Sequence, residues 1–155
     1  MNRKLPSTEL LGSSQIEIHY KRPHFHEMLC IASAQDANEI LRKYINLNQL
    51  DVRECFWVIL LTNANRLLGV SEVACGTTTA VQPNPKYIMQ LALLVNASAI
   101  IVAHSHPSGN LTISKSDVRE TNKLKQLAKL MDITLLDHLI ITSESFCSFA
   151  REGEL

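Results

Sequence analysis

Short continuous runs of apolar residues along this chain predict buried strands. The strongest is 53–62, which reads R-E-C-F-W-V-I-L-L-T. A run of this length without polar interruption is typical of a strand that is covered on both faces. Three further strands are predicted over 67–75, 98–103 and 134–142. The turn residues 63–66 join the first two strands as a hairpin.

Between these strands, apolar residues recur at helical spacing and predict three helices, over residues 33–47, 85–95 and 114–131. The alternation of strands and helices predicts an α/β or mixed α+β domain in three layers. We assign this domain to residues 34–155, of which 143–155 form a tail that Phe146 and Phe149 hold in place. Residues 1–33 are predicted to form an N-terminal arm.

Polar side chains with metal-binding chemistry follow the apolar run 98–103. His104 ends the run, His106 follows two positions later, and Asp117 falls in the first turn of the next helix. Residues i and i+2 of an extended backbone point the same way, so both imidazoles aim at one point. Two imidazoles and a carboxylate are typical ligands of a catalytic zinc, which keeps its fourth position open for water. Ser114 and Asp117 also fit a helix capping box, and the two interpretations do not exclude each other.

The spacing His104-x-His106, seven residues, then Ser114-x-x-Asp117, resembles the JAMM motif of MPN-domain metalloproteases. The wider text H-S-H-P-S-G-N, with L-L-D-H-L-I-I downstream, is similar to the RadC branch, whose bacterial members are named for DNA repair. Two positions depart from the usual RadC text, Ser105 in place of Asn and Ile113 in place of Pro, and neither is a ligand. Residues 1–33 also lack the pattern of the helix-hairpin-helix region that longer RadC chains carry.

The resemblance implies a three-layer, cytidine-deaminase-like fold with a mixed sheet, and one Zn²⁺ held by His104, His106 and Asp117. It further implies hydrolysis of peptide or isopeptide bonds, with Ser114 stabilising the oxyanion. A Glu before the first long strand acts as base in this family, which favours Glu54 and leaves Glu72 as the alternative. Two other functions stay open: a non-catalytic MPN interaction module and a DNA-repair-associated protein.

Two other histidine positions allow competing interpretations. His24-x-His26, beside Glu27, is a second possible metal pair, although no third ligand follows at a recognisable spacing. His138 lies within an apolar strand, where a histidine is usually satisfied by a core hydrogen bond. The alternative for His138 is that it orients a metal ligand from behind.

Composition and charge narrow the possible partners and the compartment. The chain has 15 basic and 15 acidic residues, which argues against a strong sequence-independent nucleic-acid binder. The family name is therefore the sole reason to consider nucleic acid as a partner. No apolar stretch reaches the roughly 20 residues of a membrane helix. The cysteines form no C-x-x-C pair and no signal peptide is recognised, so we expect free thiols at Cys55 and Cys75 and a cytoplasmic location. The alternating residues 15–21 predict an edge strand, which offers a route to a homo-oligomer.

Overall fold

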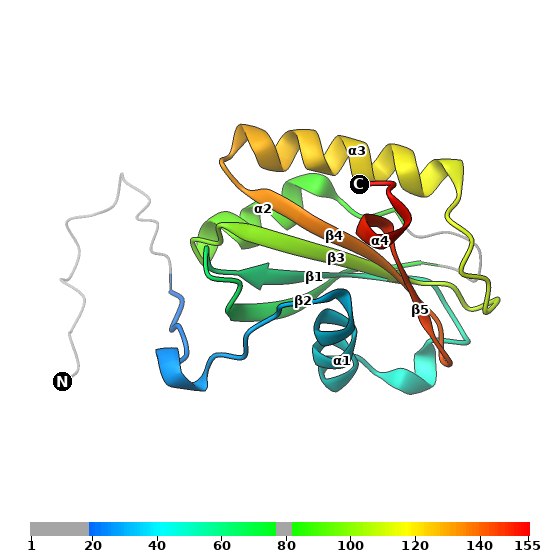
Figure 1. Cartoon of the computed structure of the whole chain (residues 1–155), viewed down its shortest axis with the longest axis horizontal. Coiled ribbons are helices and arrows are strands. Elements are labelled where there is room, and N and C mark those ends of the chain that lie inside the picture. Colours follow the sequence, from blue (N-terminus) through cyan, green and yellow to red (C-terminus); the bar gives the residue numbers. More distant parts are fainter. Residues whose placement is uncertain (1–18, 77–81) are drawn as a thin grey trace, which may run out of the picture.

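A five-stranded mixed sheet forms the centre of the protein (Figure 1). The computed structural model describes residues 19–76 and 82–155. The strands are β1 (Cys55–Leu61), β2 (Leu67–Cys75), β3 (Ala99–Ser105), β4 (Thr134–Ile141) and β5 (Phe146–Ser148). Their order in the sheet is β2-β1-β3-β4-β5. β3 and β4 are parallel, and the other neighbouring pairs are antiparallel.

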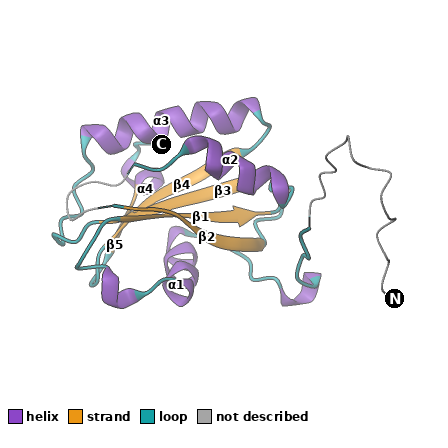
Figure 2. Ribbon diagram, turned by 180° about the vertical axis from the view of Figure 1, so that it is seen from behind, coloured by secondary structure: helices purple, strands orange, loops and turns teal. Residues whose placement is uncertain are grey.

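Helices cover both faces of this sheet, which makes the three layers that the sequence predicts. The helices are α1 (Ala34–Tyr44), α2 (Pro85–Leu94), α3 (Lys115–Leu130) and α4 (Phe149–Glu152), with 3-10 turns η1 (Phe25–Glu27) and η2 (Leu47–Gln49). α2 and α3 pack on one face and α1 on the other (Figure 2). The predicted fold class, mixed α/β with a flanked mixed sheet, is confirmed.

The position of β1 inside the sheet, between β2 and β3, explains why its sequence is apolar throughout. Phe56 and Val58 face the core under α2 and α3, whereas Trp57 and Ile59 face the core under α1. Because successive side chains of a strand alternate between faces, a strand covered twice must be apolar at every position. All seven residues of β1 are buried, as the continuous run predicts.

The C-terminal tail is more regular than the sequence suggests. Residues 143–155 contribute β5, which pairs with the end of β4, and the single turn of α4. Phe149 is fully buried, so it does hold this segment down. A strand of three residues is too short to show a period of two, and its existence depends on the free edge of β4.

The residues before α1 contact the start of β2. Met28 and Ile31 are buried, the Ile31 N–H donates to the Asn65 carbonyl, and the Leu67 N–H donates to the Leu29 carbonyl. Of the edge strand predicted over 15–21, residues 15–18 lie outside the described residues and residues 19–21 form no strand.

The prediction of free thiols at Cys55 and Cys75 is wrong, because the two are disulfide-bonded. The β1–β2 register sets Cys55 directly opposite Cys75, and sequence patterns do not fix that register. Cysteine usage therefore no longer argues for a reducing compartment. Cys30 and Cys147 are free thiols. None of the helices in the described part of the chain is long and apolar enough to cross a membrane.

Candidate metal centre

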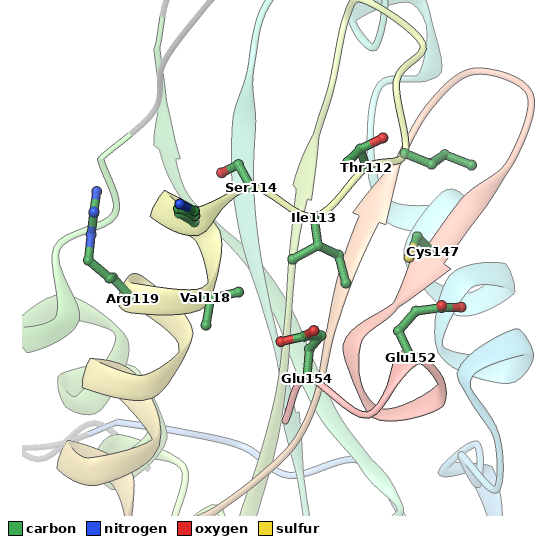
Figure 3. A pocket seen from close by; sticks show the side chains of 10 residues that line it. Thr112, Ile113, Ser114, Val118, Arg119, Cys147, Glu152 and Glu154 are labelled. Atoms are coloured by element: carbon green, nitrogen blue, oxygen red, sulfur yellow. The ribbon is translucent and has the colours of Figure 1, made fainter.

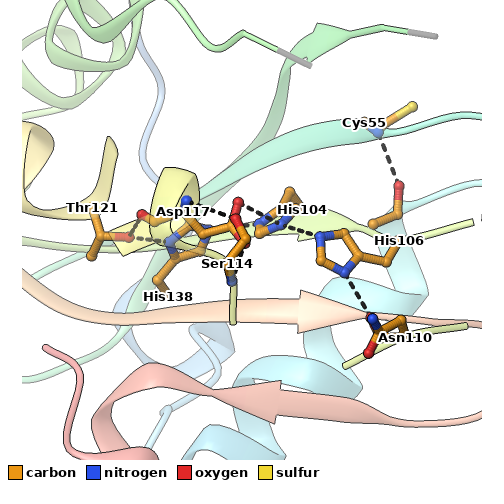
Figure 4. A network of polar contacts seen from close by, with 9 residues as sticks. Cys55, His104, His106, Asn110, Ser114, Asp117, Thr121 and His138 are labelled. Atoms are coloured by element: carbon orange, nitrogen blue, oxygen red, sulfur yellow. Dashed lines mark hydrogen bonds and ion pairs between the residues drawn. The ribbon is translucent and has the colours of Figure 1, made fainter. Parts of the chain in front are cut away.

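The end of β3 and the start of α3 bring the three predicted ligands together. His104 is the second-to-last residue of the buried strand β3, and His106 follows the strand directly. Their Nε2 atoms are 2.9 Å apart, and the His104 Nε2 atom is 3.7 Å from Asp117 Oδ1 (Figure 4). A ligand atom from each of the three residues lies within 4.8 Å of the others.

The capping box at the start of α3 leaves Asp117 able to bind a cation. The Asp117 N–H donates to Ser114 Oγ at 3.1 Å, and the Ser114 N–H donates to Asp117 Oδ2 at 2.9 Å. Asp117 Oδ1 is the oxygen nearest to His104. One carboxylate oxygen therefore caps the helix while the other faces the imidazoles, so the local cap fixes the orientation of the third ligand.

The geometry of these donors fits a zinc ion. Ligands at about 2.0–2.1 Å from a tetrahedral zinc are separated from each other by roughly 3.4 Å. The observed separations of 2.9 and 3.7 Å lie on either side of that value. His106 Nδ1 contacts the Asn110 carbonyl oxygen at 2.7 Å, and since a carbonyl only accepts, Nδ1 carries the proton and Nε2 keeps its lone pair. His106 is thus ready to bind a metal through Nε2.

His104 is held in its neutral form. Burial lowers the pKa of His104 to about 4, the Asp117 carboxylate opposes that shift, and a charge on His106 adds to it. Removing an imidazolium from water is costly, which is why the neutral ring is preferred. A neutral imidazole is the form that binds metals, so this ligand needs no deprotonation at neutral pH.

The candidate base Glu54 directly precedes β1 and is partly buried. The Gly76 N–H donates to the Glu54 carbonyl, which continues the β1–β2 ladder one residue beyond β1. Because Glu54 is two residues before Phe56, the alternation of an extended strand assigns both side chains to one face. Phe56 is the Cα partner of His104 and stacks on its ring, so this is also the face of the candidate ligand His104.

The alternative base, Glu72, belongs to the opposite face. Its Cα partner is Trp57, which packs in the core under α1. Cys55 lies on the same face as Trp57, and a register shift between Phe56 and Trp57 brings Cys75 to that face as well. The ligand atoms of Cys55, Glu72 and Cys75 lie within 4.8 Å of one another. The sheet therefore separates Glu72 from His104.

Ser105, between the candidate ligands His104 and His106, ties β3 to the backbone on both sides of Glu54. Its hydroxyl accepts from the Cys55 N–H at 2.9 Å and donates to the Arg53 carbonyl at 3.1 Å. The residue is fully buried. A single side chain thus fixes the distance between the candidate base and the histidine pair, a role that the sequence analysis missed because no local pattern signals it.

A cleft of about 780 Å³ opens at the start of α3 (Figure 3). Ser114 lines it, as do apolar side chains of the loop before α3 and of α3 itself. Lys115 and Arg119 contribute positive charge on α3, whereas Glu152 and Glu154 contribute negative charge from the C-terminal segment. The cleft is thus lined by side chains of opposite charge, and Ser114, which caps the helix that carries Asp117, is one of its lining residues.

The rival pair His24-x-His26 does not form a comparable group. Both side chains are exposed, and their rings stack at a centroid distance of 5.7 Å. The metal-compatible groups found among the described residues include neither histidine. Glu27 is 4.0 Å from His26, and no further ligand joins them within the described part of the chain.

The fold and the ligand group define a class of protein, a mixed α/β domain with a His₂Asp site at the carboxyl end of a central strand. Residues 31–154 match the family described as RadC-like JAB domain. The chain belongs to this family, as the resemblance of its motif predicts.

The curated relatives that match the chain share one name, which states no activity. UPF0758 proteins from Histophilus somni (strain 2336), Vibrio cholerae and Cellvibrio japonicus are 44%, 44% and 33% identical to the chain over 101, 103 and 142 residues. These matches cover 65%, 66% and 91% of this chain. They cover only 46%, 65% and 63% of the relatives, so the chain spans less than two thirds of their length.

Proposed function

We propose that this protein is a zinc-dependent hydrolase that cleaves peptide or isopeptide bonds. The observation that carries the proposal is the convergence of His104, His106 and Asp117, whose ligand atoms lie within 4.8 Å of one another. Membership of the RadC-like JAB domain family is compatible with this chemistry. In the proposal, these three residues hold one Zn²⁺.

When bound, zinc supplies Lewis-acid chemistry, since it polarises a carbonyl group and makes a water molecule more acidic. Glu54 accepts the proton of the attacking water and passes it to the leaving amine. The Ser114 hydroxyl stabilises the developing oxyanion by a hydrogen bond. Its oxygen already accepts from the Asp117 N–H, so its own proton remains available to donate. The cleft beside Ser114 provides room for an extended peptide.

The first test is the metal content of the purified protein, measured by elemental analysis after incubation with Zn²⁺. We expect about one zinc per chain in the wild type and none in His104→Ala. The matched control is His26→Ala, which removes an exposed histidine from the rival pair. If His26→Ala abolishes zinc binding and His104→Ala does not, the zinc site at His104 is refuted and the rival pair with His26 is supported instead.

The second test separates metal binding from catalysis with a library of peptides and isopeptide-linked peptides. Glu54→Gln should keep zinc and lose hydrolysis, because an amide cannot accept the proton. Glu72→Gln, on the other face of the sheet, should keep both. A protein that takes up no zinc contradicts the proposal and favours the MPN interaction module. Zinc uptake with DNA binding and no cleavage of any peptide would favour the DNA-repair-associated alternative.

A further inference from the structure

A chain of buried hydrogen bonds leads from one candidate ligand to the backbone of another (Figure 4). His104 Nδ1 is 2.8 Å from His138 Nε2, and His138 Nδ1 is 2.6 Å from Thr121 Oγ1. The Thr121 hydroxyl donates to the Asp117 carbonyl at 2.6 Å. His104, His138 and Thr121 are 4%, 2% and 2% exposed, so bulk water does not compete for these groups.

The Asp117 carbonyl, the last acceptor in this series, sets the direction of each of these hydrogen bonds. A carbonyl oxygen can only accept, so Thr121 spends its single proton on Asp117. The Thr121 oxygen must then accept from His138 Nδ1–H. A neutral imidazole carries one proton, which leaves His138 Nε2 with a lone pair that accepts from His104 Nδ1–H. His104 Nε2 is consequently free of a proton and faces His106 and Asp117.

The reverse direction has the opposite consequence for the metal site. If Thr121 donated to His138, then His138 Nε2–H would donate to His104 Nδ1. The proton of His104 would then sit on Nε2, the atom that faces Asp117 at 3.7 Å. A protonated nitrogen has no lone pair for a metal. The direction of two hydrogen bonds therefore decides whether His104 is a ligand.

We propose that Thr121 and His138 are positioning residues that hold His104 in its Nδ1–H tautomer and thereby prepare Nε2 to bind a metal. This inference rests on the proposed zinc site and adds two residues to it. His106 achieves the same state through one direct contact to the Asn110 carbonyl. His104 lies deeper, at the end of a buried strand, and reaches its carbonyl through two side chains. Outer partners of this kind fix the tautomer and orientation of metal-bound histidines in general.

Aromatic packing keeps the His138 ring in place for this role. The Phe149 ring stacks on His138 with centroids 4.4 Å apart and planes at 17°. Phe56 contacts the same ring from another side, at 5.6 Å and 57°. The His138 ring therefore has little freedom to turn, and its two nitrogens stay in contact with His104 and Thr121.

The direct test is the tautomeric state of His104 in the metal-free protein, read from long-range ¹H–¹⁵N correlation spectra with ¹⁵N-labelled histidine. We expect a protonated Nδ1 and an unprotonated Nε2 for both His104 and His138. A native protein in which His104 carries its proton on Nε2 overturns the proposal. The measurement needs neither zinc nor a substrate, so it is decisive even if the protein hydrolyses no peptide.

Variants of Thr121 test whether the tautomer of His104 depends on the hydrogen bonds through His138 and Thr121. Thr121→Val keeps the side-chain shape but removes the hydroxyl, and we expect the His104 tautomers to mix and zinc affinity to fall by about 10- to 100-fold. Thr121→Ser should restore both. Thr134→Val, the same change at an exposed position of β4, is the matched control and should bind zinc like the wild type.

Wild-type zinc affinity and an unchanged His104 spectrum in a folded Thr121→Val variant would overturn the role of Thr121. If Thr121→Val does not fold, the wild-type spectrum and the affinity of Thr121→Ser decide instead. An intact tautomer and tight zinc binding without peptide hydrolysis would refute the proposed function and leave this inference standing. The reverse combination, hydrolysis with His104 protonated on Nε2, would refute the inference alone.

Discussion

Acid should destabilise the metal-free protein at a pH where exposed carboxylates are still ionised. His104 is 4% exposed, and burial lowers its pKa from 6.5 to about 4. Between these two values the unfolded chain binds a proton at this position and the folded chain does not. The free energy of unfolding must therefore fall as the pH is lowered through this window, and it recovers as the pH is raised.

The size of the effect follows from the shift. One pKa unit corresponds to about 1.4 kcal/mol, so His104 alone should lower the free energy of unfolding by about 2 kcal/mol at pH 5 relative to pH 8. The loss approaches about 3 kcal/mol near pH 4. Burial, with neighbouring His104 and His106, also holds the pKa of His138 well below its usual value, so this second histidine acts in the same direction. A domain of this size has a total stability of only about 5–15 kcal/mol.

The assay is urea unfolding of chelator-treated protein, followed by circular dichroism at several pH values between 8 and 5. His104→Gln should lose about 2 kcal/mol of the wild-type pH dependence. His26→Gln, a change at an exposed histidine, should keep all of it. A wild-type stability that does not change between pH 7 and pH 5, or an equal slope in His104→Gln, would refute the reasoning.

Three further predictions test single contacts. The variants Ser114→Ala and Ser33→Ala each remove a helix N-cap hydroxyl, and each should lower the free energy of unfolding by about 1 kcal/mol. Only Ser114→Ala should also lower kcat, and equal kcat losses in the two variants would contradict the oxyanion role of Ser114. Ser105→Ala leaves the buried Cys55 N–H unpaired and should lower the free energy of unfolding in urea by about 1–3 kcal/mol. It should also lower kcat at unchanged zinc content. A variant as stable as the wild type would contradict the importance of the Ser105 hydrogen bonds. The cysteines of the Cys55–Cys75 disulfide are 20 residues apart, and its reduction should lower the free energy of unfolding by about 3 kcal/mol. If a reductant has no effect on the unfolding of the wild type, the presence of this disulfide is contradicted.

The regular elements were predictable where one period extends over enough residues. The continuous burial of β1 and the cap of α3 depend on neighbouring residues, and both have a clear sequence signal. The short β5 was not predictable, because three residues show no period and the strand forms only against β4. The edge strand predicted over 15–21 relied on alternation alone, and its described residues, 19–21, form no strand.

By itself, the sequence determined the spacing of His104, His106 and Asp117 and the capping box that turns one Asp117 oxygen toward the imidazoles. These are local features, since they depend on the period of a strand and the first turn of a helix. The tertiary structure decided which distant residues support them. Ser105 meets the backbone of Cys55 across 50 residues of sequence, and His138 meets His104 across 34. Such contacts depend on strand order and register, which arise only when the whole sheet forms, so no local pattern encodes them.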